Sequence, residues 1–196
     1  MREQSKWLLF DLGGVLMNFI GVPELAKLAG KSLEDTRNTL FFSDAVELHQ
    51  VGKISDEQFA ANYVAEVSLD ISPEDFLALW ESWETGPLEG AMELLDELAG
   101  ENNLACLSNT NNAHWVRLMA RYGLRERLQR HYASHQIGFA KPDPRIFAYV
   151  ANDLGTAPEN ITYFDDAQHI VDAAITFGFD AYQVNGPADI RQILGT

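Results

Sequence analysis

The sequence predicts an α/β fold with a parallel sheet, helices on both faces of that sheet, and a helical insertion after the first strand. Short apolar runs alternate with longer segments of helical periodicity, which is typical of a parallel sheet covered on both faces. The alternation is broken by residues 18–87, where the patterns are helical and no strand is expected. We therefore expect a core domain of residues 1–17 and 88–196 and a cap domain of residues 18–87.

The apolar runs and helical segments can be assigned in chain order. Five runs are predicted to be strands: Trp7–Phe10, Leu104–Leu107, Tyr132–Ala133, Ile161–Phe164 and Ala181–Val184. Three segments between the later strands have helical periodicity: Asn112–Tyr122, Pro144–Leu154 and Ala167–Phe177. Parallel strands need long crossover connections of this kind, so the order favours a parallel sheet.

Two helices can be placed inside the insertion. Ser55, followed three residues later by Gln58, is predicted to begin one helix, and Ser72, followed by Pro73, to begin another. Apolar residues then recur at helical spacing: Phe59, Tyr63, Val67, Phe76, Trp80 and Trp83. We interpret these side chains as the packing core of a lid over the carboxyl ends of the strands, where such folds bind ligands.

The charge balance excludes several classes of partner. The chain has 29 acidic and 14 basic residues, a formal net charge of −15, which argues against nucleic-acid and anionic-membrane partners. An anionic substrate would therefore need cations inside the site. Cys106 is the single cysteine, so neither an internal disulfide nor a cysteine metal cluster is expected. The apolar run at Trp7–Phe10 is too short for a signal peptide or a membrane helix, and a cytoplasmic protein is predicted.

Polar residues that could carry chemistry follow the first two predicted strands. Asp11 ends the first apolar run and is followed by Gly13 and Gly14, which allow backbone N–H groups to approach an anion. Ser108 and Asn109 follow the second run and offer neutral donors for phosphate oxygens. Taken alone, each of these patterns is also compatible with an ordinary turn or a helix N-cap.

Two further pieces lie later in the chain. Lys141 precedes Pro142, which favours an extended backbone, and Asp143 with Pro144 is predicted to begin a helix, so Lys141 is fixed in its loop. Asp165 and Asp166 follow the fourth apolar run directly. Adjacent carboxylates repel each other unless a cation lies between them, and magnesium, which takes oxygen ligands, is the expected cation.

The four pieces together, in this order and each at a strand end, resemble the four signature motifs of the haloacid dehalogenase superfamily. The local sequences, Asp-Leu-Gly-Gly-Val-Leu and Lys-Pro-Asp-Pro-Arg-Ile-Phe among them, are most similar to small bacterial sugar-phosphate phosphatases of the alpha-glucose-1-phosphatase type. This resemblance implies a Rossmann-like core with a small α-helical cap. It also implies a Mg²⁺-dependent phosphatase that acts on a small phosphorylated metabolite.

The resemblance also implies a role for each site residue. Asp11 would be the nucleophile, forming a phosphoaspartyl intermediate, and Lys141 would neutralise charge on Asp11 and the phosphoryl group. Ser108 and Asn109 would bind phosphate oxygens. The magnesium ligands would be Asp11, the backbone carbonyl of Gly13, Asp166, and Asp165 either directly or through water.

One position departs from the superfamily pattern. Most of its phosphatases carry a second aspartate two residues after the nucleophile, and this residue protonates the leaving oxygen. Here that position is Gly13, and general acid catalysis is typically worth about a hundredfold to ten-thousandfold in rate. Either the substrate has a good leaving group, or another group substitutes, such as an ordered water or His49 of the insertion, which we also predict to contact substrate.

Three alternative functions remain open at this point. A metal-free 2-haloacid dehalogenase would use the same aspartate but would not need the pair Asp165–Asp166. A catalytically silent binding or regulatory domain would explain Gly13, although it would have no reason to retain a buried charge cluster. A phospho-accepting receiver domain would carry its acidic pair before the acceptor and would lack the cap. We expect a monomer or weak homodimer.

Overall fold

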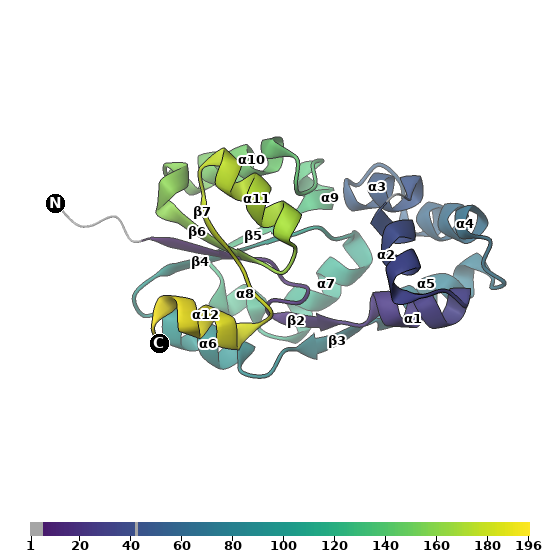
Figure 1. Ribbon diagram of the computed structural model, residues 1–196, viewed down its shortest axis with the longest axis horizontal. Coiled ribbons are helices and arrows are strands. Elements are labelled where there is room, and N and C mark those ends of the chain that lie inside the picture. The colour runs from purple at the N-terminus through teal and green to yellow at the C-terminus, as the bar shows by residue number, and fades with distance from the viewer. Residues whose placement is uncertain (1–5, 42) are drawn as a thin grey trace.

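The computed structural model describes residues 6–41 and 43–196, and its main element is a five-stranded parallel sheet (Figure 1). The order across this sheet is β5-β4-β1-β6-β7. These strands are β1 (Trp7–Phe10), β4 (Asn103–Ser108), β5 (Arg130–Ala133), β6 (Ile161–Asp165) and β7 (Asp180–Gln183). All five predicted strands are present, and the predicted parallel α/β fold is confirmed.

Helices cover both faces of this sheet (Figure 1). On one face, α6 (Ala91–Leu98), α7 (Asn112–Arg121) and α12 (Pro187–Leu194) pack against alternate strand residues, including Leu8 and Phe10 of β1. On the other face, α10 (Pro144–Leu154) and α11 (Gln168–Phe177) pack against Leu9. Because successive side chains of a strand point to opposite faces, a strand buried on both sides is apolar throughout, as the sequence of β1 is.

The described residues between 20 and 83 form five helices, which make a bundle beyond the carboxyl ends of the sheet strands (Figure 1). They are α1 (Gly21–Ala29), α2 (Leu33–Phe41), α3 (Asp44–Gln50), α4 (Asp56–Val67) and α5 (Pro73–Ser82). Their common core contains Phe59, Tyr63, Phe76, Trp80 and Trp83. The predicted starts are confirmed: Ser55 and Gln58 form a capping box, and Ser72 caps α5.

A short antiparallel ribbon connects the helical bundle to the sheet. It consists of β2 (Met17–Phe19) and β3 (Glu84–Pro87). The expectation that residues 18–87 contain no strand is therefore wrong. β2 is only three residues long, β3 shows no apolar alternation, and Gly86–Pro87 is also the pattern that ends a helix, so the strand signal in the sequence was weak.

The remaining elements are short. They are α8 (Leu124–Arg127), α9 (Ser134–Ile137) and the 3₁₀ turn η1 (Pro158–Asn160). No helix among the described residues has the length and apolar character needed to cross a bilayer.

In the main sheet, β1 lies between β4 and β6. The chain connections therefore run in opposite directions on the two sides of β1. Open α/β sheets bind ligands at the carboxyl ends of strands at such a point.

Candidate active site

Three strand ends bring the predicted site residues together. Phe10 of β1 is in register with Cys106 of β4 and with Phe164 of β6. The residue after Phe10 is Asp11, whose backbone N–H donates to the Phe164 carbonyl at 2.8 Å. Ser108 ends β4 and Asp165 ends β6, so these residues and Asp11 lie at the same edge of the sheet.

Lys141 lies between two of the carboxylates. Its Nζ is 2.9 Å from Asp11 Oδ1 and 2.7 Å from Asp165 Oδ2. Its side chain is 1% exposed, and that of Asp165 is 0% exposed. Burial alone would lower the pKa of Lys141, but the carboxylates of Asp11 and Asp165 outweigh burial and raise it. The lysine is therefore a fixed positive charge in an otherwise acidic protein.

The backbone of Lys141 is held by Asn109. The Asn109 side-chain amide donates to the Lys141 carbonyl at 2.8 Å, and the Lys141 N–H donates to the Asn109 Oδ1 at 2.8 Å. The loop that contains Lys141 is also fixed where it joins α10. As predicted, Asp143 caps this helix and Pro144 is its first residue. These two hydrogen bonds leave one N–H of the Asn109 amide free of the Lys141 backbone, and the predicted contact of Asn109 with phosphate stays a prediction.

Tyr163 belongs to this cluster and was missed by the sequence analysis. Its hydroxyl donates to Asp165 Oδ2 and accepts from Lys141 Nζ at 2.9 Å. The Ala167 N–H donates to the other oxygen, Oδ1 of Asp165, at 2.9 Å. Tyr163 precedes Asp165 by two residues in β6, so strand alternation puts both side chains on the same face, and this spacing was the available signal.

The carboxylates of Asp11, Asp165 and Asp166 are placed to share a cation. One oxygen from each lies within 4.8 Å of the others. Burial raises the pKa of Asp11 to about 7, Lys141 opposes this rise, and Asp165 adds to it. Burial and then Asp165 also raise the pKa of Asp166. Three carboxylates this close together repel one another, and a cation between them would relieve the repulsion. Their oxygens are the donors that a hard divalent cation such as Mg²⁺ prefers.

The two glycines after Asp11 differ in what surrounds them. Gly14 has φ +73°, and a Cβ on it would lie 2.5 Å from Asp166 Oδ2, so this position requires glycine. At Gly13, by contrast, a Cβ would meet no atom within 4 Å. The absence of a carboxylate at position 13 is therefore not imposed by lack of space. The predicted metal contact of the Gly13 carbonyl stays a prediction.

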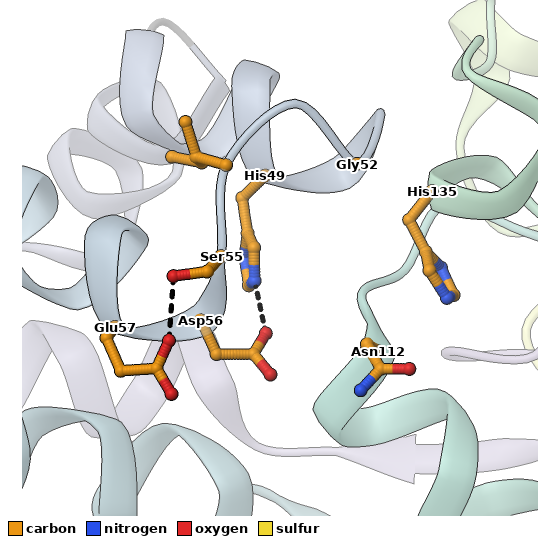
Figure 2. Close-up of a pocket in the computed structure, with 8 residues that line it drawn as sticks. His49, Gly52, Ser55, Asp56, Glu57, Asn112 and His135 are labelled. Atoms are coloured by element: carbon orange, nitrogen blue, oxygen red, sulfur yellow. Dashed lines mark hydrogen bonds and ion pairs between the residues drawn. The ribbon is translucent and has the colours of Figure 1, made fainter.

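His49 lies in the helical bundle and is 4% exposed. Its Nε2 is 2.7 Å from Asp56 Oδ1, and its ring stacks on Phe59 with the ring centres 4.1 Å apart. Burial lowers the pKa of His49, and Asp56 opposes this effect. The histidine lines a cavity of about 290 Å³, whose opposite wall includes Asn112 and His135 of the core (Figure 2). Its predicted contact with substrate stays a prediction.

The sheet order, the helical insertion after the first strand and the cluster of carboxylates around a buried lysine are together typical of enzymes of the haloacid dehalogenase class. Residues 6–178 match the haloacid dehalogenase-like hydrolase family. The chain belongs to this family, and it is accordingly a hydrolase.

Individual relatives span nearly the whole chain. A D-ribitol-5-phosphate phosphatase of Bacteroides thetaiotaomicron is 27% identical, with 96% of each chain aligned. A crystal structure of a haloacid dehalogenase family enzyme from the same organism, in complex with magnesium and inorganic phosphate, is 25% identical, covers 92% of this chain and 94% of that one, and has a TM-score of 0.74. The L-2-haloacid dehalogenase of Xanthobacter autotrophicus shares the fold at a TM-score of 0.71 and 21% identity, covering 98% of this chain and 83% of that one.

Proposed function

We propose that this protein is a Mg²⁺-dependent phosphatase that hydrolyses a small phosphorylated metabolite of the sugar-phosphate or polyol-phosphate type. The observation that carries this proposal is the contact of Lys141 with Asp11 and Asp165 at the edge of a three-carboxylate cluster. A metal-free dehalogenase would have no use for such a set of oxygen donors. The similarity to a D-ribitol-5-phosphate phosphatase over nearly the whole chain supports the substrate class.

The proposal assigns different functions to two parts of the chain. Residues 1–17 and 88–196 would form the catalytic core, and residues 18–87 would form a cap that holds the leaving group. Two observations support this division. The helical bundle has a hydrophobic core of its own, and the ribbon of β2 and β3 joins it to the sheet near both proposed boundaries.

In the first step a carboxylate oxygen of Asp11 attacks phosphorus. A bond forms between this oxygen and phosphorus, the ester P–O bond breaks, and the leaving alkoxide takes a proton from water or from a nearby group. Lys141 orients Asp11 through its contact with Oδ1, and its positive charge offsets charge on the phosphoryl oxygens. The hydroxyl of Ser108, at the end of β4, would donate to one of those oxygens.

When bound, Mg²⁺ would neutralise charge on the phosphoryl group and polarise it for attack. The residues that would hold it are Asp11, Asp166, Asp165 and the backbone carbonyl of Gly13. Asp166 is the more available of the acidic pair because it is exposed, whereas both oxygens of Asp165 already accept hydrogen bonds from the protein. This difference supports direct binding by Asp166 and binding by Asp165 either directly or through water.

In the second step water attacks phosphorus of the aspartyl phosphate, releases inorganic phosphate and restores Asp11. Gly13 supplies no acid for the first step and no base for the second, so an ordered water or a group from the cap must move these protons. We expect esters whose leaving group needs little protonation to react faster for this reason.

The test is phosphate release from p-nitrophenyl phosphate, D-ribitol 5-phosphate and glucose 1- and 6-phosphates, with Mg²⁺ or with EDTA. Asp11→Asn is the loss-of-function control, and we expect it to lower kcat by about a thousandfold or more. Halide release from 2-chloropropionate is measured alongside. Halide release without metal, and no phosphate release with it, would replace the proposal by a dehalogenase. No release of either product from folded protein would favour the silent binding domain.

A further inference from the structure

The side chain of Tyr163 is fully buried, and its hydroxyl lies between Lys141 and Asp165. We infer that Tyr163 is a positioning residue, which holds the ammonium group of Lys141 in a fixed orientation beside Asp11. This inference rests on the proposed function, in which Asp11 attacks phosphorus and Lys141 orients it. It adds a residue of the apolar core to those on which the reaction depends.

Lys141, Asp165 and Tyr163 form a closed triangle of hydrogen bonds. The Lys141 Nζ donates to Asp165 Oδ2 at 2.7 Å and to the Tyr163 hydroxyl at 2.9 Å, and that hydroxyl in turn donates to Asp165 Oδ2. Asp165 is also held from its other side, because the Ala167 N–H donates to Oδ1 at 2.9 Å. Each member of the triangle is bonded to both of the others, so none can move without breaking two hydrogen bonds.

The triangle leaves one N–H of Lys141 for the nucleophile. An ammonium group has three N–H donors, and Asp165 and Tyr163 accept from two of them. Two fixed N–H directions prevent rotation about the Cε–Nζ bond, and the third direction is then fixed as well. Asp11 Oδ1 lies 2.9 Å from Nζ. Without the Tyr163 hydroxyl, Asp165 alone would hold the ammonium group, which could rotate relative to Asp11.

The aromatic ring of Tyr163 is part of the apolar core. It packs edge-on against Phe147 of α10 and against Phe179, with the ring centres 6.3 Å apart in both pairs. This packing fixes the position of the hydroxyl, and a phenylalanine ring would fill the same apolar space. A buried hydroxyl is unfavourable unless it is hydrogen-bonded, so packing alone gives no reason for a tyrosine here. The reason lies in the contacts of the hydroxyl with Lys141 and Asp165.

Tyr163→Phe removes the hydroxyl and keeps the ring. The same apolar cluster offers a matched control in Tyr132 of β5, which is buried and donates to Asp153 Oδ2 at 2.7 Å. Tyr132→Phe therefore removes a hydroxyl–carboxylate hydrogen bond from the same face of the sheet without changing the triangle. The general effect of losing a buried hydroxyl should be similar in the two variants, whereas effects on Lys141 should be confined to Tyr163→Phe.

The first readout is the NMR signal that correlates the nitrogen and the protons of lysine ammonium groups, recorded without metal or substrate. The other four lysines are exposed: Lys6, Lys27, Lys31 and Lys53. Their ammonium protons exchange rapidly with water, whereas Lys141 is 4% exposed and should give a persistent signal, which its absence from Lys141→Arg assigns. We expect Tyr163→Phe to shift or abolish this signal and Tyr132→Phe to retain it. An unchanged signal in Tyr163→Phe would overturn the inference, and so would the absence of a persistent signal in wild type.

The second readout is hydrolysis of p-nitrophenyl phosphate at saturating Mg²⁺, together with the Mg²⁺ dissociation constant from calorimetry. Tyr163→Phe should lower kcat about tenfold or more, the effect of one hydrogen bond to a charged group, and should change KM and the Mg²⁺ dissociation constant less than about threefold. Tyr132→Phe should leave all three within about twofold of wild type. An unchanged kcat in Tyr163→Phe would overturn the inference. A change in Mg²⁺ affinity alone would also overturn it, because the hydroxyl would then act on the metal through Asp165.

The two readouts separate this inference from the proposed function. If wild type releases no phosphate, the proposed function is rejected, and the ammonium signal alone decides whether Tyr163 positions Lys141. If wild type is active, a loss of kcat together with a changed ammonium signal in Tyr163→Phe, and in neither respect in Tyr132→Phe, supports the positioning role. Equal losses of kcat in the two variants would reject that role while leaving the proposed function intact.

Discussion

The side chain of Asn109 binds both polar groups of the Lys141 backbone, each at 2.8 Å. This pair of hydrogen bonds joins the loop after β4 to the loop before α10, and it fixes the backbone from which Lys141 reaches Asp11 and Asp165. A residue predicted to contact phosphate thus has a second role, the positioning of the cationic side chain.

Asn109→Asp tests this positioning role. The carboxylate cannot donate to the Lys141 carbonyl and repels it, so we expect kcat on p-nitrophenyl phosphate to fall about tenfold or more with a smaller change in KM. Asn152→Asp adds the same charge on the exposed side of α10 and should keep full activity. A rise in KM for phosphate esters with kcat unchanged would indicate phosphate binding as the main role of Asn109.

Removal of Lys141 should affect stability as well as activity. Lys141→Met leaves Asp11 and Asp165 buried without their cation, and we expect a loss of about 3–5 kcal/mol in the free energy of unfolding, measured by urea denaturation without metal. Adding Asp165→Asn to this variant removes one of the two charges and should recover part of that stability, while activity stays absent. Equal stability of the single and double variants would contradict this account.

The metal-free protein should lose stability as the pH rises. Burial raises the pKa of Asp11 from 3.8 to about 7, so between about pH 4 and 7 the folded state binds a proton that the unfolded chain has lost. The stabilising effect of that proton is fully present below the unfolded pKa of 3.8 and is lost as the pH rises to about 7. Urea unfolding in EDTA should therefore give a free energy that decreases across this window, with a smaller decrease in Asp11→Asn. The stabilisation by added Mg²⁺ should increase over the same range, because the metal competes with this proton.

Gly13 can be used to test the missing acid directly. A side chain at this position would meet no atom within 4 Å of its Cβ, so Gly13→Asp should fold. If protonation of the leaving oxygen limits the first step, this variant should hydrolyse ribitol 5-phosphate faster, by up to about a hundredfold, with little gain on p-nitrophenyl phosphate. Gly13→Asn has nearly the same shape and no titratable proton, and it serves as the matched control. Equal rates for the two variants on ribitol phosphate would show that another group already supplies the proton.

The sequence predicted the parts of this molecule that depend on local pattern. The apolar runs at the five strands of the main sheet and the caps at Ser55, Ser72 and Asp143 have signals within a few residues, and these were all predicted. Contacts between residues that are far apart in the sequence were harder to predict. Tyr163 contacts Lys141, from which it is 22 residues away in sequence, and Asn109 contacts Lys141 across a sequence separation of 32 residues. The cavity lining also comes from residues 49–57, 112 and 135, which are far apart in the chain, so no local pattern could have predicted it.

The contact between His114 and Trp80 supplies the last prediction, since it joins α7 of the core to α5 of the helical bundle. His114 Nε2 lies 2.7 Å from the Trp80 carbonyl, Nδ1 lies 3.1 Å from the Asn111 amide nitrogen, and the ring stacks on Trp80. His114→Phe keeps the stacking and removes both hydrogen bonds, so we expect a loss of about 1–3 kcal/mol in the free energy of unfolding. It should also raise KM for ribitol 5-phosphate, because the orientation of the cap over the site is less constrained.

The same two helices contain a matched control for His114→Phe. Arg117 and Glu81 form an exposed ion pair at 3.8 Å, and such pairs contribute less than about 1 kcal/mol. Arg117→Ala should therefore change both the urea midpoint and KM much less. Similar effects in the two variants would mean that the buried histidine bond is no more important than a surface contact in holding the cap. A larger change in stability and KM in His114→Phe alone would show that the hydrogen bond from His114 to the Trp80 carbonyl positions α5 relative to the loop after Ser108.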